Sequence, residues 1–453
     1  MVNDNTLELN IPQGTAARAV PADVVQTRPF TDKHIWGVYL FLVAISLIEL
    51  YSASSREVTS SSLGVFGPLV RHGFMLLAGF FIMLGLQRTH YIWVYRLTVP
   101  MVAVSVVMMI YVLLFGEEIN GAKRAFTLIV TIQPAEFLKI TAAMFIAWLT
   151  SRNQLKGGKV KDVALWGSGF LVLIYGGLLI TQGLTNTLLL MAISVSMMII
   201  GGIGIGQFLK FIGILAIPGI LLLLLSIAMT GIKDEPAPAD TATEQMTTSE
   251  KVASAGGILG RLNTWTARLE RHQGDGRPKY EQELNATNRQ EMYAYMAQAH
   301  GGVFGVGPGN SRETARLPLA FSDYIYSIII EEWGLAGGLF VLLLYLWLLC
   351  RAAAIAGSCA RAYPSLLVLS MALMIGFQAL AHMAIVSGFA PVSGQPLPLI
   401  SKGGTSILVT SIALGIMLSV SRHAVRTSSK KQDIKAEASE LPEELRGDNP
   451  SSF

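Results

Sequence analysis

Long apolar runs recur along this chain and constrain its fold more than any other feature. A helix needs about 20 mostly apolar residues to cross the hydrocarbon core of a bilayer. Ten runs qualify, and they lie around residues 34–54, 65–87, 93–115, 135–151, 164–181, 186–202, 207–230, 325–350, 364–388 and 404–421. Hydrophobic residues make up 52% of the chain and charged residues only 14%. The sequence therefore predicts an all-α polytopic membrane protein with about ten transmembrane helices.

The basic residues of the short loops predict how the helices are oriented. If the N-terminus is cytoplasmic, the short loops after even-numbered helices and the C-terminal tail are cytoplasmic too, and they hold a cluster of Lys and Arg residues, as the positive-inside rule requires. These residues are Arg88, Arg152, Lys156, Lys159, Lys161, Arg351, Arg361, Arg422, Arg426, Lys430 and Lys431. We therefore expect a multi-pass protein of the cytoplasmic (inner) membrane with both termini in the cytoplasm.

Three regions are expected along the chain. Residues 1–33 would be a cytoplasmic tail, residues 34–421 the membrane domain, and residues 422–453 a disordered cytoplasmic tail. The gap between the seventh and eighth helices, about 231–322, would be a large outer loop, and loops of this length are usually functional or disordered. Its part at about 233–256 is rich in Ala, Thr, Ser, Glu and Pro, which predicts a flexible insertion.

Ionisable residues near the ends of apolar runs are the candidate site residues, because charges at membrane depth are costly and usually face a cavity. Under the predicted topology, six lie at or near the outer face: Arg71, Lys123, Arg124, Lys139, Lys402 and Asp323. Glu136 precedes Lys139 by three residues and would share its helix face. A cavity with several cations and few acids suits an anionic ligand, and its depth suggests a lipid tail. A lipid-linked pyrophosphate fits that description.

Each of these residues also has a purely structural interpretation. Glu136 and Lys139 could form a local ion pair, Arg71 could extend to the lipid headgroups, and Asp323 could cap the apolar helix that follows it. The glycines of "GGVFGVGPGNS" could let the backbone turn sharply near a ligand or another helix. The prolines of "GFAPVSGQPLPLISKGGTS" must interrupt a helix, and such backbone is tolerated where protein or a water-filled cavity covers it.

Three motifs in fixed order resemble those of a known family. The first reads "NGAKRAF…QPAEFLKI" and is similar to Asn-Gly-Ala-Lys/Arg-Arg-Trp followed by Gln-Pro-Ser-Glu-Phe-x-Lys. The second reads "LPLAFSDYIYSIIIEEWGLAG" and is similar to Leu-Pro, His-Thr-Asp-Phe-x-Phe and Glu-Glu-x-Gly-x-x-Gly. The third reads "GFAPVSGQPLPLISKGGTS" and is similar to Pro-x-x-Gly-x-x-Leu-Pro-x-x-Ser-Tyr-Gly-Gly-Ser-Ser. From about residue 35 to 421 the chain thus resembles the shape, elongation, division and sporulation (SEDS) membrane proteins typified by FtsW and RodA.

The resemblance implies a peptidoglycan glycosyltransferase that polymerises lipid II, an undecaprenyl-pyrophosphate-linked disaccharide peptide, at the outer membrane face. It implies a class B penicillin-binding transpeptidase, other divisome proteins and membrane lipid as partners. The essential carboxylate of the family corresponds to Asp323, and its cavity glutamate and lysine to Glu136 and Lys139. The "SKGG" residues, Ser401, Lys402, Gly403 and Gly404, would contact substrate. The tails and the "IELYSASS" stretch are most similar to FtsW, which favours septal synthesis in division over RodA-like elongation.

Several positions depart from the family pattern. Leu319 stands where the family has a glutamate and Phe321 where it has a histidine, so Asp323 has no neighbouring imidazole in sequence. Ala125 replaces a tryptophan and Lys402 a tyrosine. The segment "TQGLTNT" lacks the aspartate usual in that motif.

As a mechanism, we expect Asp323 to act as general base or to orient the sugar hydroxyl that attacks an anomeric carbon. The departing pyrophosphate would be stabilised by the cations Lys139, Arg71, Lys123, Arg124 and Lys402. No metal-ligand cluster is visible and the cofactor is unknown, so a divalent cation stays an open alternative. No basic helix or aromatic ladder suggests nucleic acid. A lipid II flippase and a scaffold for a transpeptidase are the rival functions.

Overall fold

The computed structural model describes residues 31–54, 66–119, 122–127, 131–155, 159–210, 212–213, 216, 272, 282, 284–285, 288–317 and 320–424. Most of the predicted seventh helix, the insertion at 233–256 and nearly all of both tails lie outside these residues. So do Leu319 and the tail basic residues Arg426, Lys430 and Lys431.

Nine of the ten predicted apolar runs correspond to helices within the described ranges. Their bounds are α1 (Lys33–Ser54), α2 (Phe66–Arg88), α3 (Tyr91–Phe115), α4 (Pro134–Arg152), α5 (Asp162–Ile180), α6 (Leu184–Ile200), α11 (Ile325–Ser358), α12 (Ala362–Val386) and α13 (Gly404–His423). Seven of them are long and apolar enough to span a membrane, while α6 is apolar but shorter. The helix α4 is not among the seven and carries Glu136 and Lys139 in its first two turns. The predicted all-α membrane fold is confirmed, although the described residues do not establish the full number of helices.

The remaining elements are short and lie between these helices. A three-stranded antiparallel sheet, β1 (Glu117–Ile119), β2 (Ala122–Thr127) and β3 (Thr131–Ile132), joins α3 to α4. The helix α10 (Arg289–Gly301) packs against α11, and a single 3₁₀ turn follows at Glu313–Ala315. A regular helix therefore occupies 289–301, inside the segment of about 231–322 that was predicted to be a large outer loop.

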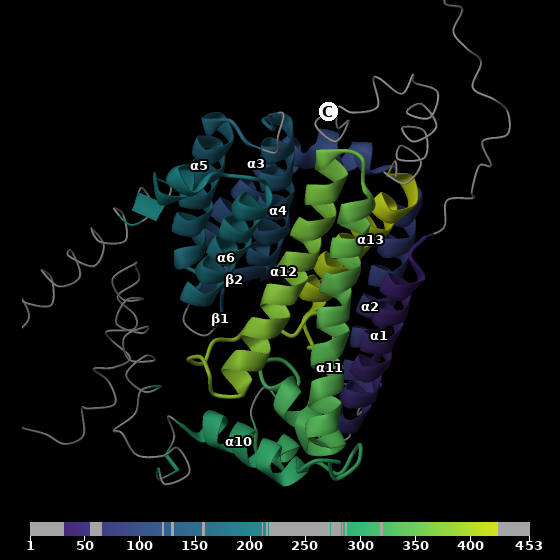
Figure 1. Ribbon diagram of the computed structural model, residues 1–453. Coiled ribbons are helices and arrows are strands. Elements are labelled where there is room, and N and C mark those ends of the chain that lie inside the picture. Colours follow the sequence, from purple (N-terminus) through teal and green to yellow (C-terminus); the bar gives the residue numbers. More distant parts are fainter. Residues whose placement is uncertain are drawn as a thin grey trace, which may run out of the picture. The chain divides into compact units, whose positions relative to one another are not determined.

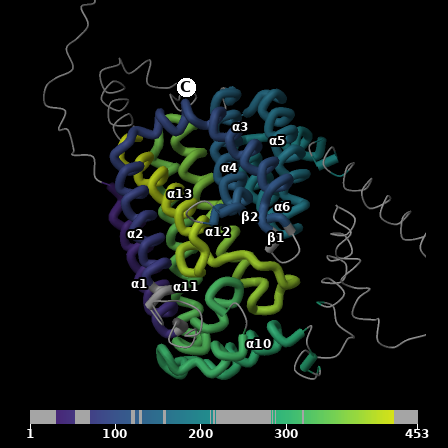
Figure 2. Tube along the Cα trace, turned by 180° about the vertical axis from the view of Figure 1, so that it is seen from behind, coloured from purple at the N-terminus to yellow at the C-terminus, as the bar shows by residue number. Residues whose placement is uncertain are grey.

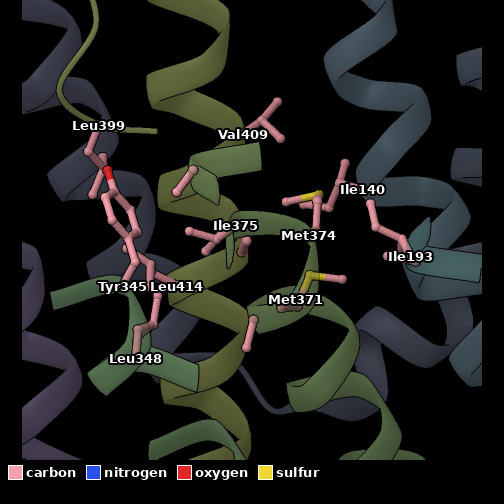
Figure 3. Close-up of a cluster of buried hydrophobic side chains, with 14 of the residues drawn as sticks. Ile140, Ile193, Tyr345, Leu348, Met371, Met374, Ile375, Leu399, Val409 and Leu414 are labelled. Carbon is pink, nitrogen blue, oxygen red and sulfur yellow. The ribbon is translucent and has the colours of Figure 1, made fainter. Parts of the chain in front are cut away.

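The helices α11, α12 and α13 lie between the α1–α2 pair and the group α3 to α6 (Figures 1 and 2). In the most apolar window of α13, 83% of the residues are buried, and in that of α12 72%, against 22% in α3. The helices α12 and α13 therefore form much of the core, whereas α3 turns most of its apolar side chains outward, as a lipid-facing helix does. Figure 3 shows part of this core, a cluster to which Ile140 of α4, Tyr345 of α11, Met374 of α12 and Leu414 of α13 contribute.

Both described ends of the chain lie at the same end of the helices. Asp32, just before α1, accepts a hydrogen bond from Arg351 near the end of α11. One pocket is lined by both of these residues together with Ser421 and Ala424 at the end of α13. An even number of membrane crossings between the two ends would produce this arrangement.

The glycine-rich stretch packs backbone against backbone on α11. Gly334 breaks α11, with φ 75° and ψ −177°, and this exposes backbone groups. The N–H of Val306 donates to the carbonyl of Glu331 (3.0 Å), and the N–H of Leu335 donates to that of Gly302 (2.9 Å). A Cβ added to Gly305 would lie 2.3 Å from the Glu332 carbonyl oxygen. Of the two sequence interpretations of these glycines, close approach to another helix is the one the structure supports.

Candidate functional site

The segment between α12 and α13, residues 387–403, is irregular and is called the proline loop below. Its carbonyl groups are bonded by side chains from the surrounding helices. Gln378 donates to the carbonyl of Pro396 (3.3 Å), Tyr345 to that of Pro398 (2.5 Å) and Ser46 to that of Ile400 (3.2 Å). Leu399 adopts φ 65°, a backbone conformation that a non-glycine residue keeps only where its surroundings fix it. Protein therefore covers the later part of this non-helical backbone, residues 395–401, as expected for such a segment within a membrane protein. The earlier part is more open, because Phe389, Pro391 and Gly394 are exposed.

The proline loop is bonded to the segment that precedes α11. The hydroxyl of Ser401 donates to the carbonyl of Ser322 (2.7 Å) and accepts from the N–H of Leu397 (2.7 Å). The N–H of Lys402 donates to the carbonyl of Phe321 (2.8 Å). Ser401 is fully buried. Its side chain holds the backbone next to Asp323, and its contact with substrate stays a prediction.

Asp323 is half-buried at the start of α11, with its carboxylate against the proline loop. The hydroxyl of Ser322 donates to its Oδ1 (2.8 Å), and its Oδ2 lies beside Gly394, where an added Cβ would be 2.9 Å away. Burial raises the pKa of the Asp323 carboxyl, and the hydrogen bond from Ser322 and the charge of Arg124 oppose that rise. The carboxylate is therefore a stronger base than an exposed aspartate would be.

Asp323 is not the capping residue of α11. The residue at the N-cap position is Tyr324, and the helix start has no side-chain cap hydrogen bond. The interpretation of Asp323 as a helix cap is therefore wrong for this structure.

Glu136 and Lys139 form a buried ion pair near the start of α4. The Nζ of Lys139 lies 2.7 Å from the Oε1 of Glu136, and the side chains are 1% and 6% exposed. The same ammonium donates to the Oε1 of Gln378 on α12 (2.8 Å). The pair is therefore more than a local contact within one helix, because it joins α4 to α12. The contact of this lysine and glutamate with substrate stays a prediction.

The other predicted cations lie in different settings. Arg124 is on β2, and its charge acts on Asp323. Lys123 donates to the carbonyl of Leu114 at the end of α3 (2.9 Å), so its ammonium is engaged there. Lys402 is half-buried and close enough to His72 for the ammonium charge to act on that imidazole.

The remaining predicted residues are placed as follows. Arg71 is exposed on α2. Gly403 is the N-cap residue of α13 and Gly404 its first residue. Of the departures from the family pattern, Ala125 is fully buried and Phe321 packs against the core.

Sequence reasoning did not single out Gln378 or Ser322, and it gave no role to Gly394. Gln378 left a usable signal, because it is a polar residue inside an apolar run. Gly394 lies within the quoted third motif, but its contact with Asp323 joins residues far apart in the chain. Within the described ranges, no three His, Cys, Asp or Glu side chains are grouped so that they could hold a metal ion.

Comparison with known proteins places this fold among relatives. A family model for FtsW, RodA and SpoVE, described as cell cycle protein, matches residues 32–270 and 278–426. Stage V sporulation protein E of Bacillus subtilis is 28% identical over 406 residues, which cover 85% of this chain and 96% of that protein. A Geobacter sulfurreducens protein named probable peptidoglycan glycosyltransferase FtsW is 26% identical over 398 residues, which cover 85% of this chain and 95% of that protein.

Solved structures show the same fold. A chain from a structure described as "Structural coordination of polymerization and crosslinking by a peptidoglycan synthase complex" superposes with a TM-score of 0.60 at 24% identity, covering 86% of this chain and 98% of that one. The rod shape determining protein RodA of Thermus thermophilus superposes with a TM-score of 0.56 at 23% identity. The match covers 87% of this chain and 97% of that one. The family model matches most of the chain, and the fold agrees with its membrane helices. The chain therefore belongs to the FtsW/RodA/SpoVE family of integral membrane proteins.

Proposed function

We propose that this protein is a peptidoglycan glycosyltransferase that polymerises lipid II at the outer face of the cytoplasmic membrane. One observation carries the proposal: the half-buried carboxylate of Asp323, with its raised pKa, lies at the start of a membrane helix and feels the charge of Arg124. The relatives named peptidoglycan glycosyltransferases support the reaction class.

In the proposed reaction a sugar hydroxyl attacks the anomeric carbon of a second lipid II molecule. The new glycosidic C–O bond forms as the C–O bond to the pyrophosphate breaks, and the hydroxyl proton passes to the carboxylate of Asp323. A base is most effective when its pKa approaches the working pH, so burial of this carboxyl favours the step.

The departing pyrophosphate needs positive charge, and Arg124 is the cation whose position best supports that role. Its guanidinium charge acts on Asp323, so it lies near the reacting groups. Lys402, which follows Ser401 in the proline loop, is the second candidate. We assign Lys139 a bracing role instead, because it is buried and bonded to Glu136 and Gln378. Electrostatic stabilisation by preoriented groups of this kind commonly supplies a large share of catalysis.

We further propose that both termini are cytoplasmic and that the partner is a class B penicillin-binding transpeptidase, with septal synthesis in division as the setting. One pocket is lined both by Asp32, just before α1, and by Ser421 and Ala424 at the end of α13, which is consistent with this topology. The basic residues in the loops after even-numbered helices are consistent with it too. The similar structure described as a peptidoglycan synthase complex supports a crosslinking partner.

The test is polymerisation of purified lipid II by the full chain in detergent, alone and with its transpeptidase. Glycan chains made by the wild type support the transferase. In liposomes, inward-to-outward movement of lipid II without any chain formation would favour the rival flippase. If the protein neither makes glycan chains nor moves lipid II while the transpeptidase is demonstrably bound, the result would favour the scaffold function.

A further inference from the structure

Gly394 lies directly beside the carboxylate of Asp323. An added Cβ would lie 2.9 Å from the Oδ2 of Asp323, 3.5 Å from its Cγ and 3.6 Å from its Oδ1. The backbone does not itself demand glycine, since Gly394 is not among the described glycines with left-handed φ values. The absence of a side chain at residue 394 therefore sets the space that the carboxylate occupies.

The residues next to Gly394 are fixed by α12. The Nδ1 of His382 lies 2.6 Å from the carbonyl oxygen of Gln395, and Gln378 donates to the carbonyl of Pro396 (3.3 Å). The side-chain Nε2 of Gln395 also donates to the Oδ1 of Asn186 on α6 (3.1 Å). Because these bonds hold the loop immediately after Gly394, the wall that faces Asp323 is rigid.

Gln378 connects that wall to the buried ion pair. Its Oε1 accepts from Lys139 (2.8 Å), and its Nε2 donates to the proline loop, so one amide joins α4, α12 and the loop. An amide bonded at both ends cannot rotate without breaking both hydrogen bonds, which fixes its orientation. The ion pair therefore acts on the position of the loop.

The far end of the proline loop holds the backbone of the Asp323 segment. Ser401 bonds the carbonyl of Ser322, and the N–H of Lys402 bonds that of Phe321. Asp323 is thus fixed from two sides by a single loop, which holds the chain before it through hydrogen bonds and its carboxylate through contact with Gly394.

We propose that Gly394 and Gln378 are positioning residues for the transfer reaction, and that the Glu136–Lys139 pair acts on Asp323 through them. The inference rests on the proposed function of Asp323 as the base. The missing side chain at Gly394 gives the Asp323 carboxylate its space. Gln378 links the ion pair to the proline loop, because it is bonded to both Lys139 and Pro396.

The test compares Gly394→Ala with the wild type in lipid II polymerisation. The new methyl meets the end of a side chain, which can rotate, so we expect the fold to persist while the carboxylate moves. A displacement of about 1 Å in a reacting group costs on the order of a hundredfold in rate. We therefore expect kcat to fall about tenfold to a hundredfold, with KM changed less than about threefold.

Gly177→Ala is the matched control, because a Cβ at Gly177 on α5 meets nothing within 4 Å. It makes the same chemical change, and we expect wild-type kcat, KM and melting temperature. Gln378→Leu is a second variant, which removes the bonds to Lys139 and to Pro396, and it should also lower kcat more than it changes KM.

The outcomes separate this inference from the proposed function. If the wild type makes no glycan with its transpeptidase bound, the proposed function fails. If the wild type is active and Gly394→Ala keeps its kcat, the positioning role is wrong and the function stands. A rise in KM that accounts for the whole loss would contradict the inference too, because the loop would then contact substrate. A melting temperature that falls together with kcat would show that Gly394 serves the fold.

Discussion

The charged side chains of Lys139 and Asp323 differ in how completely they are paired. Lys139 is bonded to Glu136 and Gln378 and is almost wholly buried. Asp323 is half-buried, with one hydrogen bond from Ser322 and the more distant charge of Arg124. The buried and fully paired ammonium of Lys139 is suited to holding α4 against α12, because its hydrogen bonds are already made within the protein. Partial pairing at the edge leaves a carboxylate that can still accept a proton.

Removing one member of the buried pair should have the largest effect on stability. Lys139→Met would leave the carboxylate of Glu136 buried and uncompensated, which costs about 3–5 kcal/mol. Chemical denaturation in detergent measures the loss. Lys123→Met is the matched control, because Lys123 is half-buried and bonds a backbone carbonyl, and we expect a change below about 1 kcal/mol. Equal losses in the two variants would contradict the difference in burial.

Removing both members should cost less than removing one. Replacing a buried ion pair by apolar residues is often neutral in stability, so Glu136→Leu combined with Lys139→Met should recover to within about 1–2 kcal/mol of the wild type. The comparison of the single and double variants in the same denaturation assay provides the readout. Simple addition of the two single losses would mean that the pair does not act as a unit.

The glycine-rich stretch offers a test in which no charge is involved. Gly305→Ala places a methyl 2.3 Å from the carbonyl oxygen of Glu332, on a residue whose φ is 79°. Overpacking of this kind costs about 1–3 kcal/mol, so the melting temperature should fall. Gly177→Ala on α5 should leave it unchanged. A Gly305→Ala protein as stable as the wild type would show that the close backbone contact with α11 can relax.

A smaller effect is expected on the pH dependence of the reaction. Ser322→Ala removes a hydrogen bond that lowers the pKa of Asp323, so that pKa should rise further above its usual value. Because the base acts in its deprotonated form, the rate is lost as the pH falls through this pKa. The acidic limb of the pH–rate profile should therefore move to higher pH, by up to about one unit. Ser322→Thr keeps the hydroxyl and should leave the limb in place.

The sequence predicted the membrane helices well because each is a long apolar run, whose length and composition are local properties. Asp323 and the Glu136–Lys139 pair were found for a related reason, since a charge beside an apolar run stands out. Their settings could not be predicted, because they depend on contacts between distant segments. Gln378 reaches Lys139 across 239 positions of sequence, and Gly394 meets Asp323 only after α11 and α12 have packed. The helix α10 was missed because its sequence mixes polar residues with apolar ones.

The most direct measurement is the initial rate of lipid II polymerisation by Asp323→Asn with the transpeptidase bound. Asparagine keeps the size of the side chain and can still occupy the space beside Gly394, but it cannot accept the proton. We expect a loss of about a hundredfold to ten-thousandfold, the range that general base catalysis supplies, with an unchanged melting temperature. A rate within a few-fold of the wild type would contradict the central role of this carboxylate.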